Sequence, residues 1–238
     1  MVIANRHARK HLSFMSTAEN HRRELFNKVA LSVISHIENF DEVLRPIDFK
    51  CGEGVLVHEV LMWEKKNAPV KLPDDLKGFY STFNGFALLW KVEIRGKFIA
   101  IGDISVNKLD DLNRVPIEAK NLASEAMSAN RSIDVKSSIA FCLTNSSEFG
   151  QVILVYKSTA SKDGGITSAS FDAPEVWFVD TSQKWHYMAA NFTHFLRLAV
   201  VHLGIYGWQL AYTPEGLPAS TRQWMGLFCR ERLAVDST

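Results

Sequence analysis

Cysteine is scarce in this sequence, with only Cys51, Cys142 and Cys229 among 238 residues. The three are far apart, odd in number and never part of a Cys-x-x-Cys pair. This spacing argues against a disulfide framework and against a zinc site. We therefore expect a reduced, cytoplasmic chain with buried thiols and no bound metal.

The chain also lacks long apolar runs and a surplus of charge of either sign. Its apolar stretches are too short to span a bilayer. The N-terminal segment MVIANRHARKHLSF has basic residues but not the continuous apolar core of a secretory signal. The 27 basic and 26 acidic residues leave a net charge of +1, which argues against nucleic-acid binding and polybasic membrane attachment. We expect neither nucleic acid nor membrane among its partners.

A glycine-rich phosphate loop is missing as well. The glycines at 52–54 and 164–165 lack the strand-then-helix context and the spacing of such a loop. They fit ordinary turns, so no nucleotide or other cofactor is expected.

Candidates for catalysis are few. Cys142 with His186 could form a nucleophilic pair, but Cys142 lies in the apolar segment SIAFCL, where a buried, inert thiol is the usual outcome. His194 and His202 share one predicted helix and would lie about 12 Å apart along its axis. They could not bind one metal ion together. We expect no catalytic residue.

Large apolar side chains are abundant: 47% of the residues are hydrophobic, with six tryptophans and 15 phenylalanines. This composition predicts a globular protein with a substantial core. We expect a flexible tail over 1–16, a single domain over 17–232 and a C-terminal tail over 233–238. Flexible loops are expected near 105–136 and 158–173, where small and polar residues dominate.

Hydrophobic periodicity predicts helices first, antiparallel strands in the middle and helices again at the end. Asn84-Gly85 is interpreted as the stop signal of the third helix. This segregation indicates an α+β fold, with a central, mostly antiparallel sheet packed by N- and C-terminal helices. The expected helices are 24–40, 55–67, 73–83, 191–204 and 218–228, and the expected strands are 88–94, 97–104, 138–143, 150–157, 175–180 and 185–189.

Aromatic residues near the C-terminus are the candidates for contact with a protein partner. Trp208 and Trp224, together with Phe228, lie in a stretch that is predicted to be irregular or only briefly helical. Tryptophan is enriched at interfaces, although packing within the domain is the favoured alternative for these residues.

The segment WEKKNAPVKLPDDLKGFYSTFNGF resembles the signature of the SUKH superfamily. The pattern is an acidic residue late in a helix, then Leu-Pro, an acidic residue, an aromatic residue and Asn-Gly. The resemblance implies an α+β fold with helices against a mixed or antiparallel sheet, and a role in protein recognition without catalysis. The matching residues are Glu64, Leu72-Pro73, Asp75, Phe79 and Asn84-Gly85.

The C-terminal half is similar to a narrower family, subunit 2 of tubulin polyglutamylase complexes. Together with the SUKH-like segment, the similarity covers roughly residues 25 to 230. It rests on Glu175, Trp177, Phe178, Asp180, Trp185-His186, Phe192-Thr193, Arg197-Leu198, His202-Leu203-Gly204, Trp208-Gln209, Gly216 and Gln223-Trp224.

This resemblance implies a non-catalytic subunit that acts beside a separate tubulin-tyrosine-ligase-like chain, which binds ATP and magnesium. It also implies a place at microtubules, centrioles and centriolar satellites, with tubulin contacted directly or through other subunits. The family pattern continues into a basic tail rich in Lys, Ser and Gly, which the sequence to Thr238 does not include. The alternatives are a general SUKH-type binding module with another partner, and an enzyme that uses Cys142 or the late histidines.

Overall fold

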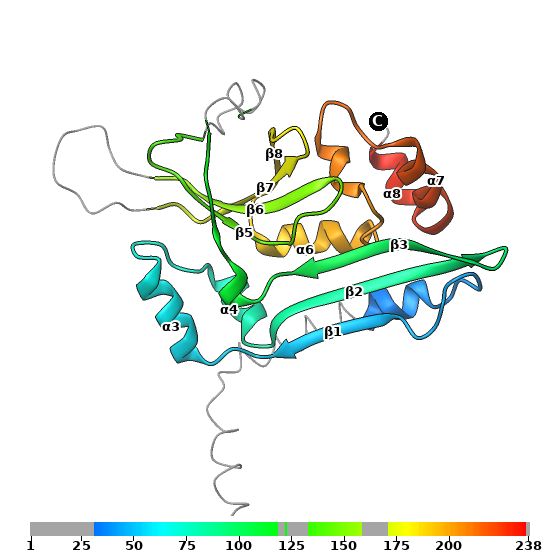
Figure 1. Ribbon diagram of the computed structural model, residues 1–238, viewed down its shortest axis with the longest axis horizontal. Coiled ribbons are helices and arrows are strands. Elements are labelled where there is room, and N and C mark those ends of the chain that lie inside the picture. Colours follow the sequence, from blue (N-terminus) through cyan, green and yellow to red (C-terminus); the bar gives the residue numbers. More distant parts are fainter. Residues whose placement is uncertain (1–30, 119–121, 123–132, 159–170, 237–238) are drawn as a thin grey trace, which may run out of the picture.

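Two antiparallel sheets form the framework of the molecule (Figure 1). The computed structural model describes residues 31–118, 122, 133–158 and 171–236. The first sheet has the order β1-β2-β3, with β1 at Asp48–Glu53, β2 at Phe83–Ile94 and β3 at Lys97–Val106. The second has the order β4-β5-β6-β7-β8, and its strands are Arg114–Val115, Ile139–Cys142, Gly150–Tyr156, Glu175–Asp180 and Trp185–Ala189.

The predicted α+β class is confirmed, but the single central sheet is wrong because the strands divide into two sheets. The division occurs after β3, where Asn107 leaves the first sheet. Its backbone amide donates to the carbonyl oxygen of Leu143 (2.9 Å), and its side-chain amide donates to that of Cys142 (3.3 Å). These bonds carry the chain across to the second sheet through a short 3-10 helix, η1, at Leu109–Asp111.

Helices cover the sheets and lie between them. The helix α6 lies between the two sheets, while α3 lies at one end of the long axis and α7 and α8 lie toward the other (Figure 1). In the described part of the chain, residues 31–37 are helical. The other helices are α3 Val57–Lys66, α4 Asp74–Tyr80, α6 Phe192–Val201, α7 Ala219–Phe228 and α8 Arg230–Asp236, with a second 3-10 helix, η3, at Trp208–Tyr212.

One large cluster of buried side chains joins both sheets to α6. Trp90 comes from the first sheet, Phe141 and Phe178 from the second, and Phe192 and Phe195 from α6, and all are at most 3% exposed. Burial of such aromatic surface is the main stabilising contribution in a domain of this size. A smaller cluster covers the other face of the second sheet and contains Ile133, Ala140, Ile153, Val155, Trp177, Val179 and Trp185.

Local sequence signals correctly place most of the described elements. Arg95 and Gly96 both have positive φ, 53° and 74°, at the tip of the β2–β3 hairpin, which is the backbone that a tight two-residue turn requires. Asn191 caps α6 by accepting a 2.9 Å hydrogen bond from the amide of His194. Gly204, with φ of +62°, lies in the turn that follows the same helix.

The interpretation of Asn84-Gly85 as a helix stop is wrong, because α4 ends at Tyr80 and both residues belong to β2. The side-chain oxygen of Asn84 accepts a 2.9 Å hydrogen bond from the amide of Leu109. Gly85 has φ of +75° and lies against Lys108, and a Cβ there would be 2.9 Å from the Lys108 amide nitrogen. The pair therefore joins β2 to η1.

The C-terminal tail expected from residue 233 is helical as far as Asp236, because α8 includes it. The expected tail over 1–16, the first part of the helix at 24–40 and most of the loop at 158–173 lie outside the described residues. None of the helices in the described part of the chain is both long and apolar enough to cross a membrane.

Candidate protein-interaction surfaces

The polar residues of the SUKH-like signature make bonds within the chain. The carboxylate of Glu64, near the end of α3, accepts a hydrogen bond from the amide of Leu72 (3.0 Å) and pairs with Nζ of Lys77 (2.8 Å). Asp75 on α4 accepts bonds from the amide of Thr193 (2.9 Å) and from its hydroxyl (3.2 Å), at the start of α6. These bonds hold α3, α4 and α6 together. The polar residues of the signature therefore stabilise the fold.

Cys142 and His186 are not brought together. They lie on β5 and β8, which are three strand positions apart, so about 14 Å of sheet separates them. Burial raises the pKa of the Cys142 thiol, and Nε2 of His186 lies 3.0 Å from the Asp180 carboxylate. The geometry therefore offers no nucleophile–base pair from these two residues.

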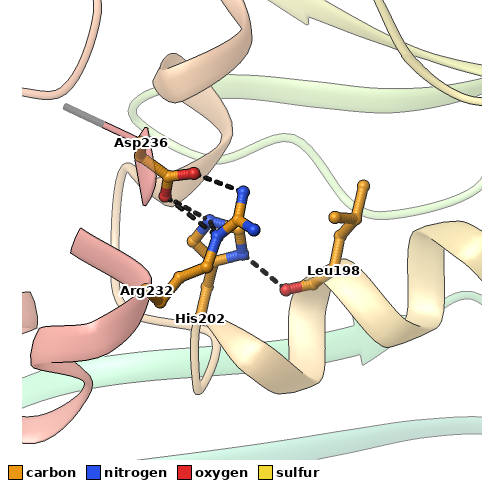
Figure 2. A network of polar contacts seen from close by, with 4 residues as sticks. All are labelled: Leu198, His202, Arg232 and Asp236. Atoms are coloured by element: carbon orange, nitrogen blue, oxygen red, sulfur yellow. Dashed lines mark hydrogen bonds and ion pairs between the residues drawn. The ribbon is translucent and has the colours of Figure 1, made fainter. Parts of the chain in front are cut away.

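His202, at the end of α6, is the centre of a buried polar network (Figure 2). Its side chain is completely buried, with Nδ1 lying 2.6 Å from the carbonyl oxygen of Leu198 and Nε2 lying 2.8 Å from the carboxylate of Asp236. Nε of Arg232 donates to the same carboxylate oxygen at 3.1 Å, and its guanidinium also pairs with the other oxygen. Arg232 and Asp236 both belong to α8, so the network fastens α8 to α6.

Two opposing effects set the pKa of Asp236. Burial alone would raise it, but the hydrogen bond and charge of His202, with the charge of Arg232, hold the pKa below its usual value. The carboxylate is therefore ionised near neutral pH. The negative charge of Asp236 strengthens its bond to His202, and this bond holds α8 against α6.

The helix α8, held in this way, forms one wall of a groove of about 650 Å³, which we call the C-terminal groove. The other walls come from the helix at 31–37, the end of α6 and the end of α7. Its floor is apolar and its rim on α8 is charged. The groove is lined by Ser32, Val33, His36, Val200, Val201, Leu203, Phe228, Cys229, Arg230, Glu231, Arg232 and Val235.

The three aromatic residues proposed for partner contact have different surroundings. Trp208 is 1% exposed and stacks on the ring of His202, with the centroids 4.5 Å apart. Phe228 is buried against Trp90, although it lines the C-terminal groove. Trp224 is half-buried and stacks on Phe228 at 6.2 Å. Packing accounts for Trp208, whereas Trp224 and Phe228 remain near a surface.

A second apolar surface lies on α3 and was missed from the sequence. Val57, Leu61 and Met62, with Leu56 just before the helix, are 58% to 72% exposed. We call these four residues the α3 face. The helix packs inward through the buried Trp63, whose ring lies 5.0 Å from that of Phe141. The helix itself was predicted from the sequence, but the side of it that faces the core depends on long-range contacts.

The relatives of the chain agree with the resemblance found in its sequence. Human tubulin polyglutamylase complex subunit 2 is 30% identical over an alignment of 187 residues, which covers 72% of this chain and 59% of the relative. The chain is a homologue of tubulin polyglutamylase complex subunit 2. The rat protein is 30% identical and the mouse protein 29% identical, each over 189 residues covering 72% of this chain and 60% of the relative.

The chain thus spans about three fifths of the length of these curated relatives. By name, they are subunits of a polyglutamylase complex. No protein-family model matches the chain, and no solved structure matches it.

Proposed function

We propose that this chain is a non-catalytic adaptor subunit of a tubulin polyglutamylase assembly, built as a single SUKH-like domain. The observation that carries the proposal is its similarity to tubulin polyglutamylase complex subunit 2 over 72% of its length. In this role it holds a separate tubulin-tyrosine-ligase-like catalytic chain and other subunits together. It would work in the cytoplasm at microtubules, centrioles and centriolar satellites.

The distribution of exposed apolar surface supports an adaptor role. An adaptor needs at least two surfaces that do not overlap, and exposed apolar patches mark such surfaces. The C-terminal groove involves α7 and α8, whereas the α3 face lies at the other end of the long axis (Figure 1). Two partners could therefore bind at the same time.

The C-terminal groove has the chemistry of a protein-binding site. Val201 and Val235 are 45% and 61% exposed at its edge, while Phe228 is buried at its base. Arg230 and Glu231 place charges of both signs on the rim. An apolar centre with a polar rim is the usual anatomy of a protein interface, and we assign this groove to a neighbouring subunit.

Reconstitution tests the proposal. The full chain, co-expressed with a tubulin-tyrosine-ligase-like chain and the remaining subunits, should elute with them in one size-exclusion peak. Mass spectrometry of tubulin tails should detect added glutamates only when the ligase-like chain is present. Association with an unrelated partner, and none with the ligase-like chain, would favour a general SUKH-type binding module.

Two variants test in that assay whether the C-terminal groove binds a neighbouring subunit. Val201→Glu and Val235→Glu place a charge at the groove edge and should lower recovery of a neighbouring subunit. Phe98→Glu is the matched control, because Phe98 is 67% exposed on the β2–β3 hairpin and does not line the groove. Equal recovery with all three variants would contradict the assignment of the groove.

A further inference from the structure

The helix α3 exposes its apolar residues on the side opposite its anchor. Successive residues of a helix point about 100° apart, which places Val57, Leu61 and Met62 within about 140° of one another and Trp63 on the opposite side. Trp63 is 7% exposed, whereas the other three are 58% or more exposed. A surface helix normally turns such a stripe toward the core. Its outward direction here leaves a group of apolar side chains exposed, which is the kind of surface that binding partners commonly cover.

The positive charges of α3 lie in its last turn, and they favour a partner that carries negative charge at that end. Lys65 and Lys66 form the last turn next to Leu61 and Met62, and neither has an ion pair with any residue in the described ranges. The acidic residues of the helix are already engaged. Glu59 accepts a 2.7 Å hydrogen bond from the amide of Leu56, and Glu64 pairs with Lys77 at 2.8 Å.

The α3 face is therefore an apolar stripe that ends in two lysines, which make no ion pair within the described part of the chain. An amphipathic helix recognises such a surface by laying its own apolar residues, at positions i, i+3, i+4 and i+7, against the stripe. Carboxylates at one end of that helix would lie against Lys65 and Lys66, which adds orientation and selectivity to the apolar contact.

We propose that the α3 face binds an acidic amphipathic helix of another protein. As the docking site for a neighbouring subunit it rests on the proposed function, but its chemistry can be tested without that assembly. The orientation follows from the charges: the acidic end of the bound helix lies at the C-terminal end of α3. This surface is separate from the C-terminal groove.

The first test uses the full chain and two designed peptides, both held helical by a side-chain lactam. One has a leucine stripe flanked at one end by glutamates, and the other has lysines in place of the glutamates. In NMR titrations, the glutamate peptide should shift backbone amide signals of residues 56–66 and bind more tightly than the lysine peptide. Equal affinities, or shifts confined to other residues, would overturn the proposal.

Variants sharpen the same measurement. Leu61→Asp should weaken binding of the glutamate peptide by at least about tenfold, since truncating or charging a central apolar contact typically has that effect. The double change Lys65→Glu, Lys66→Glu should reverse the preference in favour of the lysine peptide. Phe98→Asp is the control and should bind like wild type, and circular dichroism should show all variants folded.

A second copy of the chain or a lipid surface on the α3 face would give different results. If a second copy of the chain covers the α3 face, sedimentation will show a dimer that Leu61→Asp dissociates. If a lipid surface covers it, vesicles of anionic phospholipid will bind wild type and not Leu61→Asp. Either result would overturn the proposal of a helical protein partner.

Reconstitution of the polyglutamylase assembly separates this proposal from the proposed function. If wild type recruits the other subunits, Leu61→Asp should lose one of them while Phe98→Asp keeps it, and unchanged recovery would refute the α3 face as the docking site. If wild type recruits none of them, the proposed function fails, and the peptide titration still decides whether the α3 face binds an acidic helix.

Discussion

The indole nitrogen of Trp90 donates a 2.8 Å hydrogen bond to the carbonyl oxygen of Leu203, 113 residues further along the chain. This bond ties β2 to the turn that follows α6. Trp90 is 1% exposed, and its ring packs edge-on against Phe228 of α7 at 4.9 Å. One side chain thus connects the first sheet, the end of α6 and the C-terminal helices.

Gly102 makes this arrangement possible, because it lies opposite Trp90 in the β2–β3 ladder and leaves room for the indole. In Gly102→Ala, the new Cβ would meet the indole and would lie 2.8 Å from the Leu203 oxygen. We expect the free energy of unfolding to fall by about 2–4 kcal/mol, from overpacking and from loss of the hydrogen bond. Urea unfolding followed by tryptophan fluorescence would measure this change.

Gly226→Ala provides the matched control. Gly226 lies in α7, and the nearest side-chain atom to an added Cβ is 3.7 Å away, in Leu233. Replacing a helical glycine by alanine there should stabilise the protein by about 0.5–1 kcal/mol. If both substitutions had the same effect, the close packing of Gly102 against Trp90 would not be the cause.

The bond between Asp236 and His202 predicts how acid affects the C-terminal helix. The pKa of Asp236 is lower in the folded chain than its ordinary value of 3.8. Its stabilising contribution is therefore complete above the unfolded-state pKa and is lost as the pH falls through the lower folded-state pKa. We expect hydrogen exchange of the α8 amides to accelerate, relative to β6 amides, as the pH falls below about 4.

Asp236→Asn should remove most of this dependence. At pH 7 the variant should be about 1–3 kcal/mol less stable than wild type, because a charged hydrogen-bond acceptor for His202 and Arg232 is lost. The difference should shrink in acid, where the wild-type carboxylate is protonated. A gap that stays constant from pH 7 to pH 3 would contradict the role of the carboxylate charge.

Local patterns were enough to predict the hairpin at Arg95-Gly96, the helix that begins after Asn191 and most strand positions. Each depends on residues close together in the sequence, such as a turn that requires positive φ or an amide that a nearby side chain caps. The interpretation of Asn84-Gly85 failed because the same residues suit a helix end and an irregular strand. Only the contact with Leu109 decides between them.

Long-range relationships were not predictable in this way. His202 and Asp236 are 34 residues apart, and no sequence periodicity links them. The two separate sheets depend on where Asn107 finds its hydrogen bonds. The outward α3 face depends on which residues of that helix pack inward, and these are the buried Trp63 and the partly buried Val60. The homology to a polyglutamylase subunit was predictable because it depends on residue identities, not on contacts.

A hydrogen bond between helices gives a further stability prediction. Asp75 accepts bonds from the amide and the hydroxyl of Thr193, the second residue of α6, where backbone amides lack partners within the helix. Asp75→Ala should lower the free energy of unfolding by about 1–3 kcal/mol. Asp75→Asn removes the charge but keeps a side-chain oxygen that can accept a bond from Thr193, so chemical denaturation should show a smaller loss.

The anchoring of α3 by Trp63 links stability to the proposed docking surface. Trp63→Ala removes a buried indole that packs on Phe141 and should destabilise the protein by about 3–5 kcal/mol, with the fastest hydrogen exchange in residues 57–66. Met62→Ala changes an exposed neighbour and should alter stability by less than about 0.5 kcal/mol.

The two variants should nevertheless both weaken binding of the glutamate peptide, Trp63→Ala by disordering the helix and Met62→Ala by removing a contact. If Met62→Ala destabilised the fold as much as Trp63→Ala, the α3 face would be part of the core and not a surface for a partner.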